Sequence, residues 1–343
     1  MYLHALTTAV PAATYTQPDC WEIIQRSPAR ERLTKRSRLI LHSILRGAHG
    51  IERRQFAAPH IEQIFDQGPD ELNAIFRSEA PKLAIEALVP ALRQAGVNPT
   101  ELDALLICTC TGYLCPGLTS YVSEQLGMKT DLIMQDLVGF GCGAAIPMLR
   151  AAADLLVARP KAVVACVAVE ICSAAFYLDD DPGVLVSACL FGDGAAATVW
   201  RGSPGPSGLH AFDFKSLHLP ADRDKLRFET RNGKLRNLLD PAVPVLAAAA
   251  VARLWSDRGP RPVADVVSHA GGRDVLTALA PVLAPFALEA STAVLRDHGN
   301  MSSPSVLFAL EERLRAKGPP IEGDLWLVSF GAGFSAHSCR MGR

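Results

Sequence analysis

Cys142 is the residue whose surroundings most favour nucleophilic chemistry. It stands in the run GFGCGAA at residues 139–145, where glycine on both sides fits a tight strand-to-helix turn that leaves a side chain uncrowded. A thiol at a helix start meets unpaired backbone N–H groups and the positive end of the helix dipole. Both favour the thiolate, the form that attacks an acyl thioester. For this segment alone, glycines that merely allow close helix packing remain an alternative.

His269 and Asn300 are two further polar residues placed where they could assist such a nucleophile. His269 follows a predicted strand and precedes Gly271 and Gly272, so it would project from a strand end into a cleft flanked by glycine backbone. Asn300 lies in a turn before a predicted helix, where an asparagine more often caps the helix or forms the turn. Taken singly, each residue also fits a structural role.

Together the three side chains supply what a decarboxylative Claisen condensation needs. A thiolate takes the acyl group, while an imidazole and a carboxamide donate hydrogen bonds to a thioester carbonyl whose charge develops as carbon dioxide leaves. The Asn300 amide donates without carrying a charge. His269 as an imidazolium would also lower the pKa of Cys142. We therefore expect an enzyme that builds carbon chains.

Helix-period and strand-like segments alternate along the chain, which predicts an α/β architecture with crossover connections. In the first half they predict helices at residues 82–95, 118–126 and from Cys142 to about 157, and strands at residues 102–110, 131–137 and 161–170. The last strand is a continuous run of Ala, Val and Cys, typical of strands buried on both faces. Cys142 thus falls between a strand and a helix.

A proline- and glycine-rich junction at residues 202–208 divides the chain into two predicted halves, residues 1–201 with the cysteine and residues 209–343 with the histidine and asparagine. Asn232-Gly233 between two strand-like runs predicts a β-hairpin of residues 226–230 and 234–238. Further helices are predicted at residues 243–255, 273–283 and 303–315, and strands at residues 263–268 and from 324 onward. The halves resemble each other in their order of elements only.

Composition predicts a globular protein without a bias toward nucleic acid or membrane. Of 343 residues, 49% are hydrophobic and 20% charged, with a formal net charge of −1. No basic segment precedes an apolar stretch at the N-terminus and no apolar run approaches about 18 residues, so we expect a cytoplasmic protein without a membrane span. The nine cysteines lie mostly in apolar runs and should be free thiols. The spacing of Cys108, Cys110 and Cys115 lacks a second zinc knuckle, so we expect no metal.

The chain resembles the type III polyketide synthases, the chalcone synthase-like branch of the thiolase-fold condensing enzymes. The resemblance rests on four segments, in order along the chain: GCGAA at 141–145, LFGDGAA at 190–196, HAGG at 269–272 and GNMSS at 299–303. It covers essentially the whole chain. Each segment alone is weak, but the set is a specific match.

The resemblance implies a homodimer of thiolase-like subunits, each with two similar βαβαβαββ-type halves in a five-layered αβαβα core. It implies acyl-CoA and malonyl-CoA as substrates, with no acyl carrier protein and no metal or redox cofactor. By position, Cys142 would be the nucleophile and His269 with Asn300 the decarboxylation and oxyanion pair. Phe191 would be a gate between the CoA tunnel and the acyl cavity, although it could equally be a core aromatic before a turn. The residues that would line the cavity or approach the partner subunit are Cys110, Thr111, Cys115, Gly271 and Gly272.

A basic cluster between residues 26 and 54 gives CoA phosphates a possible site. It holds nine Lys or Arg against two Glu in a chain whose net charge is −1. The family places CoA-contacting basic residues in this N-terminal region, so we name Lys35, Arg38 and Arg46 as candidates. A solvated helix face is the alternative. Nucleic acid is disfavoured because the cluster has no interleaved aromatics.

Three departures from the plant enzymes point to a bacterial-type member. Ala332 stands where plant members carry proline, residues 234–238 hold no aromatic where a second gate would lie, and the chain is shorter. Loss of a second gating aromatic would favour a larger starter, so we expect a fatty acyl starter and a pyrone, resorcinol or related phenolic product.

Four other classes of protein are weighed. A priming β-ketoacyl synthase shares Cys, His and Asn but would carry Gln-Ala-Asn after the histidine, where this chain has Ala270-Gly271-Gly272. A thiolase needs a second catalytic cysteine, and no glycine-framed motif surrounds Cys339. A papain-like protease expects a Cys-Trp-type neighbourhood instead of glycine and alanine. A non-catalytic thiolase-fold binding protein is disfavoured by the presence of all three polar partners.

Overall fold

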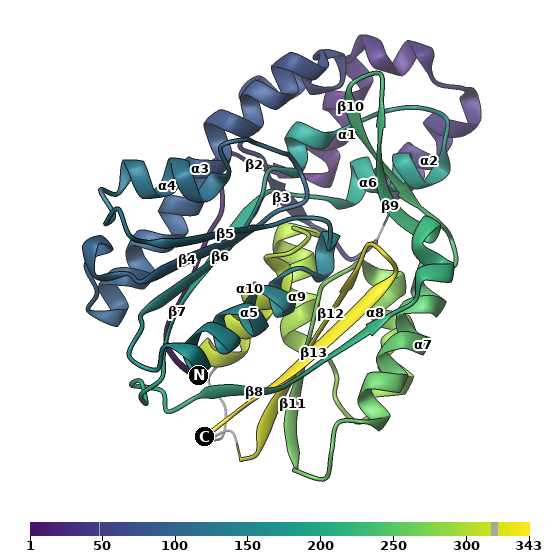
Figure 1. Cartoon of the computed structure of the whole chain (residues 1–343). Coiled ribbons are helices and arrows are strands. Elements are labelled where there is room, and N and C mark those ends of the chain that lie inside the picture. The colour runs from purple at the N-terminus through teal and green to yellow at the C-terminus, as the bar shows by residue number, and fades with distance from the viewer. Residues whose placement is uncertain (48, 317–321) are drawn as a thin grey trace.

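A computed structural model describes residues 1–47, 49–316 and 322–343, and Figure 1 shows the whole chain. Among these residues, nine strands form one mixed sheet in the order β11-β12-β13-β8-β1-β7-β6-β4-β5. The first part of the chain supplies β1 (Tyr2–Ala9), β4 (Ala104–Cys108), β5 (Ile133–Leu137), β6 (Val164–Glu170) and β7 (Gly194–Arg201). The rest supplies β8 (His210–His218), β11 (Val263–Ser268), β12 (Asp324–Gly331) and β13 (Ser335–Gly342).

The two groups of strands meet where β1 and β8 pair antiparallel at Tyr2 and His210. In each group a parallel pair is followed by an antiparallel one: β4 is parallel to β6, which is antiparallel to β7, and β11 is parallel to β12, which is antiparallel to β13. This arrangement repeats the order of elements across the sheet. The division of the chain into units at residues 201 and 209 stays a prediction.

Helices cover and separate the two groups of strands (Figure 1). Helix α3 (Pro69–Ala95) packs on β1, β6 and β7. Helix α7 (Val243–Ser256) packs on β8 and β13 and also contacts α8 (Arg273–Leu283). Helix α5 (Ala145–Ala158) contacts strands of both groups, and so does α10 (Ser305–Arg315). The predicted five-layered αβαβα core is confirmed, with α5 and α10 in its middle layer.

The buried strands have the sequences that such a core requires. Every residue of β6 and β12 is buried, as expected for strands between helical layers. Strand β6 consists mainly of Val and Ala, whereas the apolar residues of β12 are mostly the larger Leu, Trp and Phe. The elements predicted from the pattern are present with shifts at their ends, apart from α3, which begins at Pro69 rather than at residue 82. Helices α4 (Leu118–Gln125) and α9 (Glu289–His298) complete this part of the fold.

A small hairpin and three helices surround the site. The hairpin of β9 (Leu226–Arg231) and β10 (Lys234–Leu239) forms its own two-stranded sheet, as the Asn232-Gly233 turn predicts. Helix α6 (Pro182–Leu190) was not predicted; it begins after Asp181, whose carboxylate accepts from the N–H groups of Gly183 and Val184. Helices α1 (Gln17–Arg26) and α2 (Lys35–Arg46) lie nearby, and β2 (Thr14–Thr16) pairs with β3 (Arg53–Gln55).

No helix in the described part of the chain is long and apolar enough to cross a membrane. All nine cysteines are free thiols.

Candidate active site

Cys142 lies in a tight turn between β5 and α5, as its glycine neighbours predict. Residues Gly141–Gly143 form one turn of 3-10 helix, which continues into α5 at Ala145. Gly141 has φ +55°, and a Cβ there would lie 3.0 Å from the backbone nitrogen of Ala332. A side chain at this position would therefore be strained and crowded. The turn leaves the Cys142 thiol half-buried at the start of a helix.

Two side chains form a chain of hydrogen bonds that ends on Cys142. The Ser302 hydroxyl donates to Cys142 Sγ over 3.2 Å, and Cys110 Sγ lies 3.1 Å from the same hydroxyl. Because the hydroxyl has one proton and gives it to Cys142, the Cys110 thiol is the donor to Ser302. Ser302 was not among the predicted residues, although it lies two positions after Asn300 in the predicted motif.

His269 projects from the end of β11, as predicted. Its backbone N–H donates to the carbonyl of Val328 over 2.8 Å, so the neighbouring strand β12 fixes its position. The ring meets Phe330 edge-on, with centroids 5.2 Å apart, and the residue is only 1% exposed. Packing thus holds the imidazole in place, and its buried Nδ1 has no hydrogen-bond partner among the described residues.

Asn300 is held by hydrogen bonds on both its backbone and its amide. It forms a parallel bridge with Phe191, since its N–H donates to the Leu190 carbonyl and its own carbonyl accepts from Gly192 N–H. Asn300 Oδ1 accepts from the Ser302 N–H over 2.7 Å. Nδ2 donates to the Gly271 carbonyl over a longer 3.2 Å. With the oxygen engaged, the amide presents its NH2 group for a further hydrogen bond.

The three residues line one open pocket with about 1350 Å³ of empty space, solvent at its mouth included. Gly271, Gly272 and Phe191 also line it. Among the described residues, Phe191 alone lines both this pocket and a second cavity, which has about 370 Å³ of empty space, solvent included, and which Cys110 and Thr111 line. Phe191 therefore lies between the two spaces. We call them the entrance pocket and the acyl cavity.

Four of the predicted binding residues lie outside both spaces. Cys115 is exposed on a loop. Lys35 and Arg46 are exposed, and half-buried Arg38 donates its Nε to the Leu33 carbonyl over 3.0 Å. The same N-terminal segment nevertheless borders the entrance pocket through Ile44, His49 and Ile51.

Burial determines the charge state of the Cys–His pair. It raises the pKa of the Cys142 thiol to about 12, against a smaller lowering by the Ser302 hydrogen bond. It also lowers the pKa of the His269 imidazole to about 3. At neutral pH the pair is thus a thiol and a neutral imidazole. The expectation that an imidazolium lowers the Cys142 pKa does not hold at rest, because neither charge is solvated in this interior.

Glu170, which was not singled out from the sequence, connects the loops of the acyl cavity. This fully buried carboxylate at the end of β6 accepts the Ser303 hydroxyl at 2.6 Å on one oxygen. Its other oxygen accepts four hydrogen bonds from the backbone N–H groups of Cys110 and Thr111 and the hydroxyls of Thr109 and Thr111. A glutamate at the end of an otherwise apolar predicted strand is the signal that could have found it.

An aromatic residue also enters the acyl cavity from the hairpin. Residues 234–238 hold no aromatic, as noted from the sequence, but Phe228 on β9 pairs with Asn237 on β10 and both line the cavity. Phe176 and Tyr177 line it as well. With Phe191, four aromatic side chains therefore contribute to the wall of the cavity.

The layered fold and the glycine-framed thiol are those of a thiolase-like condensing enzyme, and comparisons with known proteins identify the branch. The family model for FAE1/type III polyketide synthase-like proteins matches residues 58–204. A 3,5-dihydroxyphenylacetyl-CoA synthase of Streptomyces toyocaensis is 31% identical over 284 residues, which are 77% of this chain and 73% of that protein. The 1,3,6,8-tetrahydroxynaphthalene synthase of Streptomyces coelicolor is 29% identical over 340 residues, covering 96% of this chain and 89% of the relative.

A crystal structure of 1,3,6,8-tetrahydroxynaphthalene synthase from Streptomyces coelicolor matches with a TM-score of 0.88 and 27% identity. The match covers 99% of each chain. This protein belongs to the type III polyketide synthase family. The predictions of the family, of the thiolase-like fold and of an acyl-transferring enzyme are thereby confirmed.

Proposed function

We propose that this enzyme loads an acyl group from CoA onto Cys142 and extends it with malonyl-CoA by repeated decarboxylative condensation, ending in cyclisation to a phenolic product. The observation that carries the proposal is the shared pocket: Cys142, His269 and Asn300, which come from three distant segments, line one space that Phe191 also lines. The relatives named above carry the names of synthases of small phenolic compounds, which supports the product class.

Loading begins from the neutral pair. The Cys142 thiol passes its proton to the His269 imidazole as the starter thioester arrives, because each charge then stabilises the other. The thiolate attacks the thioester carbonyl, a new C–S bond forms and the bond to CoA breaks. The released CoA thiolate takes the proton back from His269, which leaves the imidazole neutral for the next step.

Decarboxylation uses the hydrogen-bond donors of His269 and Asn300, which line the same pocket as Cys142. In malonyl-CoA the C–C bond to the carboxylate breaks, carbon dioxide leaves, and the electron pair moves to the thioester oxygen as an enolate. The neutral His269 imidazole and the Asn300 NH2 group donate to that oxygen. The enolate carbon then attacks the Cys142 thioester, a C–C bond forms and the C–S bond breaks, so that Cys142 leaves as a thiolate and takes a proton from solvent. The chain, now two carbons longer, is a CoA thioester and is loaded onto Cys142 again for the next round.

The acyl cavity supports a small starter. Its empty space behind Phe191 is only about 370 Å³ even with open solvent included, and Phe176, Tyr177 and Phe228 bound it. A growing polyketide must share this space with the starter. We therefore replace the fatty acyl starter expected from the sequence with a short acyl or malonyl-derived one.

CoA enters through the mouth of the entrance pocket. The segment that carries Lys35, Arg38 and Arg46 borders that mouth through His49 and Ile51. Basic side chains on a segment that lines this pocket suit the phosphates of CoA, which remain in solvent while the acyl arm goes inside. We retain the three as candidate CoA contacts, and cytoplasmic location remains a prediction.

A homodimer joined along β5 completes the proposed assembly. β5 is an edge strand of the sheet, and an edge with unpaired backbone groups is a usual place for another chain to dock. Beside it the side chains of Tyr113, Met134, Val138 and Phe140 are 72%, 49%, 49% and 36% exposed. Large apolar residues gathered at a sheet edge fit contact with a second copy. Cys115 lies in the same loop as Tyr113, which supports its predicted place near the partner.

Release of carbon dioxide from malonyl-CoA tests this function. Wild type and a His4→Ala control should release carbon dioxide and form extended products with a panel of acyl-CoAs, read by mass spectrometry. His269→Ala and Asn300→Ala should lose about 100-fold or more of the release, the scale for removing an oxyanion donor. Cys142→Ala should still decarboxylate but form no extended product.

Equal release by wild type, His269→Ala and Asn300→Ala would refute the assigned chemistry. Absence of any release by wild type would favour a non-catalytic binding protein. Exclusive use of long fatty acyl starters would refute the small starter while leaving the condensation intact.

A further inference from the structure

Helix α6 is the wall between the entrance pocket and the acyl cavity. Val184, Ser187 and Ala188 line the acyl cavity, whereas Pro182, Val186, Cys189 and Leu190 line the entrance pocket. Phe191 follows directly at the C-terminal end of the helix. The position of α6 therefore sets both the width of the acyl cavity and the place of Phe191.

The β9–β10 hairpin faces the same two spaces. Phe228 and Asn237 line the acyl cavity, and Leu226 and Leu239 line the entrance pocket. The hairpin is not part of the large sheet. A two-stranded ribbon alone is marginally stable, so its position depends on what it packs against. Here it packs against α6 through β10.

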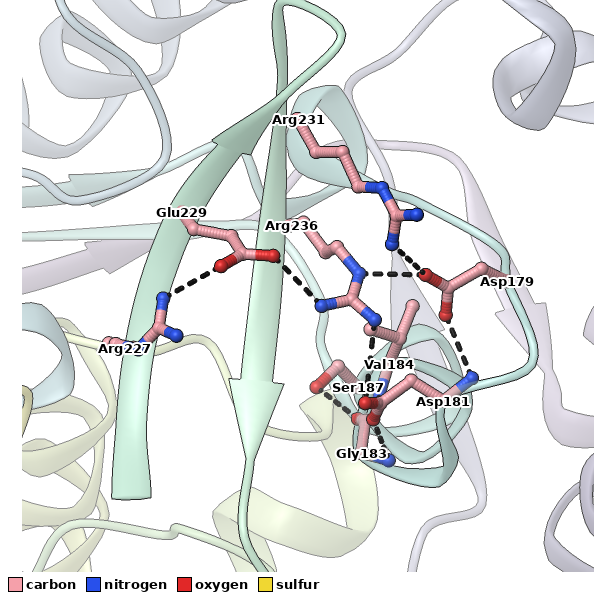
Figure 2. Close-up of polar contacts among 9 residues, drawn as sticks. All are labelled: Asp179, Asp181, Gly183, Val184, Ser187, Arg227, Glu229, Arg231 and Arg236. Atoms are coloured by element: carbon pink, nitrogen blue, oxygen red, sulfur yellow. Dashed lines mark hydrogen bonds and ion pairs between the residues drawn. The ribbon is translucent and has the colours of Figure 1, made fainter. Parts of the chain in front are cut away.

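Arg236 connects the hairpin to the start of α6 (Figure 2). Its Nε donates to Asp179 Oδ2 over 2.7 Å, one terminal nitrogen donates to Glu229 over 2.9 Å, and the other lies 3.4 Å from Asp181. The side chain is only 9% exposed. Figure 2 shows the guanidinium pointing from β10 toward Asp179 and Asp181, which precede α6. One planar group thus joins three carboxylates.

Each of the three carboxylates also accepts a hydrogen bond from a second group. The cluster therefore couples the position of the hairpin to that of the start of α6. Asp181 Oδ1 caps α6 by accepting from Gly183 N–H over 2.8 Å, and Asp179 Oδ1 accepts from Asp181 N–H over 2.9 Å. Glu229 Oε2 accepts from Arg227 over 2.9 Å. Arginine presents its donors in a fixed fork, which lysine cannot reproduce. Arg236 therefore fixes the hairpin at a defined place relative to the helix cap.

Helix α6 and strand β10 are in close contact near Arg236. A Cβ on Gly183 would lie 2.4 Å from the carbonyl oxygen of Leu239, so the first turn of α6 touches the end of β10 backbone to backbone. Successive side chains of a strand point to opposite faces. Asn237, the neighbour of Arg236, accordingly lines the cavity while Arg236 binds the acidic residues. A shift of the hairpin at Arg236 would move Asn237 and Phe228 with it.

We propose that Arg236 is a positioning residue that determines product length: by clamping the hairpin to the start of α6 it sets the width of the acyl cavity. The inference rests on the proposed function, because it concerns how far the chain on Cys142 grows. Arg236 is buried while its acidic partners are 23–38% exposed, and partly buried ion pairs of this kind can specify an arrangement more than they stabilise a fold. Release of the clamp should therefore change which products form more than whether the enzyme folds.

The test compares Arg236→Met and Asp179→Asn with Arg231→Met as a matched control. Arg231 is on the same hairpin and 3.6 Å from the same Asp179, but it is 56% exposed. An asparagine at 179 can still accept the Asp181 N–H while losing its charge toward Arg236. Each protein is assayed for carbon dioxide release from malonyl-CoA, for product lengths by mass spectrometry, and for folding by thermal melting.

Arg236→Met and Asp179→Asn should release carbon dioxide within about twofold of wild type, because the oxyanion donors are untouched. The amount of longer products relative to the main wild-type product should rise about tenfold. This is the scale on which a pocket distinguishes one methylene group. Arg236→Lys should lie in between, and Arg231→Met should match wild type. If Arg236→Met does not fold, Asp179→Asn and Arg236→Lys decide.

A wild-type product distribution in folded Asp179→Asn and Arg236→Met would overturn the inference. So would an equal change in Arg231→Met, because that would trace the effect to general charge on the hairpin. If wild type releases no carbon dioxide and forms no product, the proposed function has failed and this inference with it. That result differs from a working enzyme whose product lengths do not respond.

Discussion

The hydroxyl of Ser302 donates a hydrogen bond to the sulfur of Cys142 over 3.2 Å. Ser302 adopts φ +60°, a conformation that non-glycine residues rarely take and that costs of the order of 1 kcal/mol. Its N–H is at the same time held by Asn300 Oδ1. The turn after Asn300 thus aims a donor at the nucleophile, against the burial that raises the thiol pKa.

Removal of that donor should make the thiol less reactive. Ser302→Ala loses a hydrogen bond to the sulfur, worth about 1 kcal/mol, so the rate of Cys142 alkylation should fall about fivefold. The measurement is the second-order rate of inactivation by iodoacetamide near neutral pH, with the labelled cysteine identified by mass spectrometry.

Ser305→Ala is the control for the same loop, because its hydroxyl accepts from Met301 N–H and does not touch the thiol. It should alkylate at the wild-type rate. An equal or faster rate in Ser302→Ala would show that the hydroxyl does not activate Cys142.

The sequence predicts which residues are candidates for catalysis, but it does not predict their environment. Cys142, His269 and Asn300 stand in short motifs that mark a glycine-framed turn, a strand end and a helix start, and such local features can be read from neighbours along the chain. The hairpin was predicted because Asn232-Gly233 is a local signal as well. Burial, by contrast, is produced by segments far apart in sequence, which is why the resting charge state of the Cys–His pair was misjudged.

The missed elements have physical reasons too. Helix α6 has the sequence PGVLVSACL, and a short apolar run that is buried on several sides shows no helical periodicity. Helix α3 holds Pro81 and Pro90, so the pattern underestimates its length. The role of Glu170 cannot be predicted from its neighbours along the chain, because the partners of its five hydrogen bonds are remote in sequence. They lie as far as 61 positions before it and 133 positions after it.

Glu170→Gln should destabilise the fold although it keeps a polar side chain at this position. Glutamine can turn its oxygen toward the four donors, but its NH2 then meets the Ser303 hydroxyl, which loses its acceptor. We expect a loss of about 1–3 kcal/mol in the free energy of unfolding, measured with urea. Glu86→Gln, on the exposed face of α3, should stay within about 0.5 kcal/mol of wild type. Unchanged stability in Glu170→Gln would mean that the carboxylate does not organise these loops.

The proposed CoA contacts should affect binding and leave chemistry alone. Lys35→Ala and Arg46→Ala each remove an exposed charge beside the entrance pocket, so KM for malonyl-CoA should rise about threefold to tenfold with kcat unchanged. High salt should shrink the difference by screening. Lys161→Ala, exposed next to the start of β6, is the charge-matched control. If all three variants share the wild-type KM, the phosphates bind elsewhere.

Disruption of the β5 edge should separate the proposed dimer. Met134→Glu and Val138→Glu place charges on the apolar patch, where a second copy would have to desolvate them at a cost of several kcal/mol. Sedimentation should show a dimer for wild type and monomers for these variants. Val157→Glu is the control, since Val157 is 82% exposed near the far end of α5. A dimer that persists in both edge variants would place the interface on another face.

The buried His269 imidazole should leave a signature in the pH dependence of stability. Its pKa is lowered to about 3 in the folded protein by burial, whereas the unfolded chain has the ordinary value of 6.5. Between these values the unfolded state binds more protons. The contribution of His269 is therefore fully present above pH 6.5 and is lost as the pH falls toward 3, at up to about 1.4 kcal/mol per pH unit.

A comparison with His269→Gln isolates this effect, because glutamine does not titrate. Urea unfolding at about pH 7 and about pH 5 should show wild type losing more stability than the variant, by roughly 1–2 kcal/mol. Burial lowers the pKa of His337 to about 4 and raises that of Asp193 to about 6. Both groups titrate in both proteins and cancel in the difference. Parallel pH profiles would mean that His269 is already protonated or solvated at rest, and the neutral Cys–His pair from which loading starts would have to be abandoned.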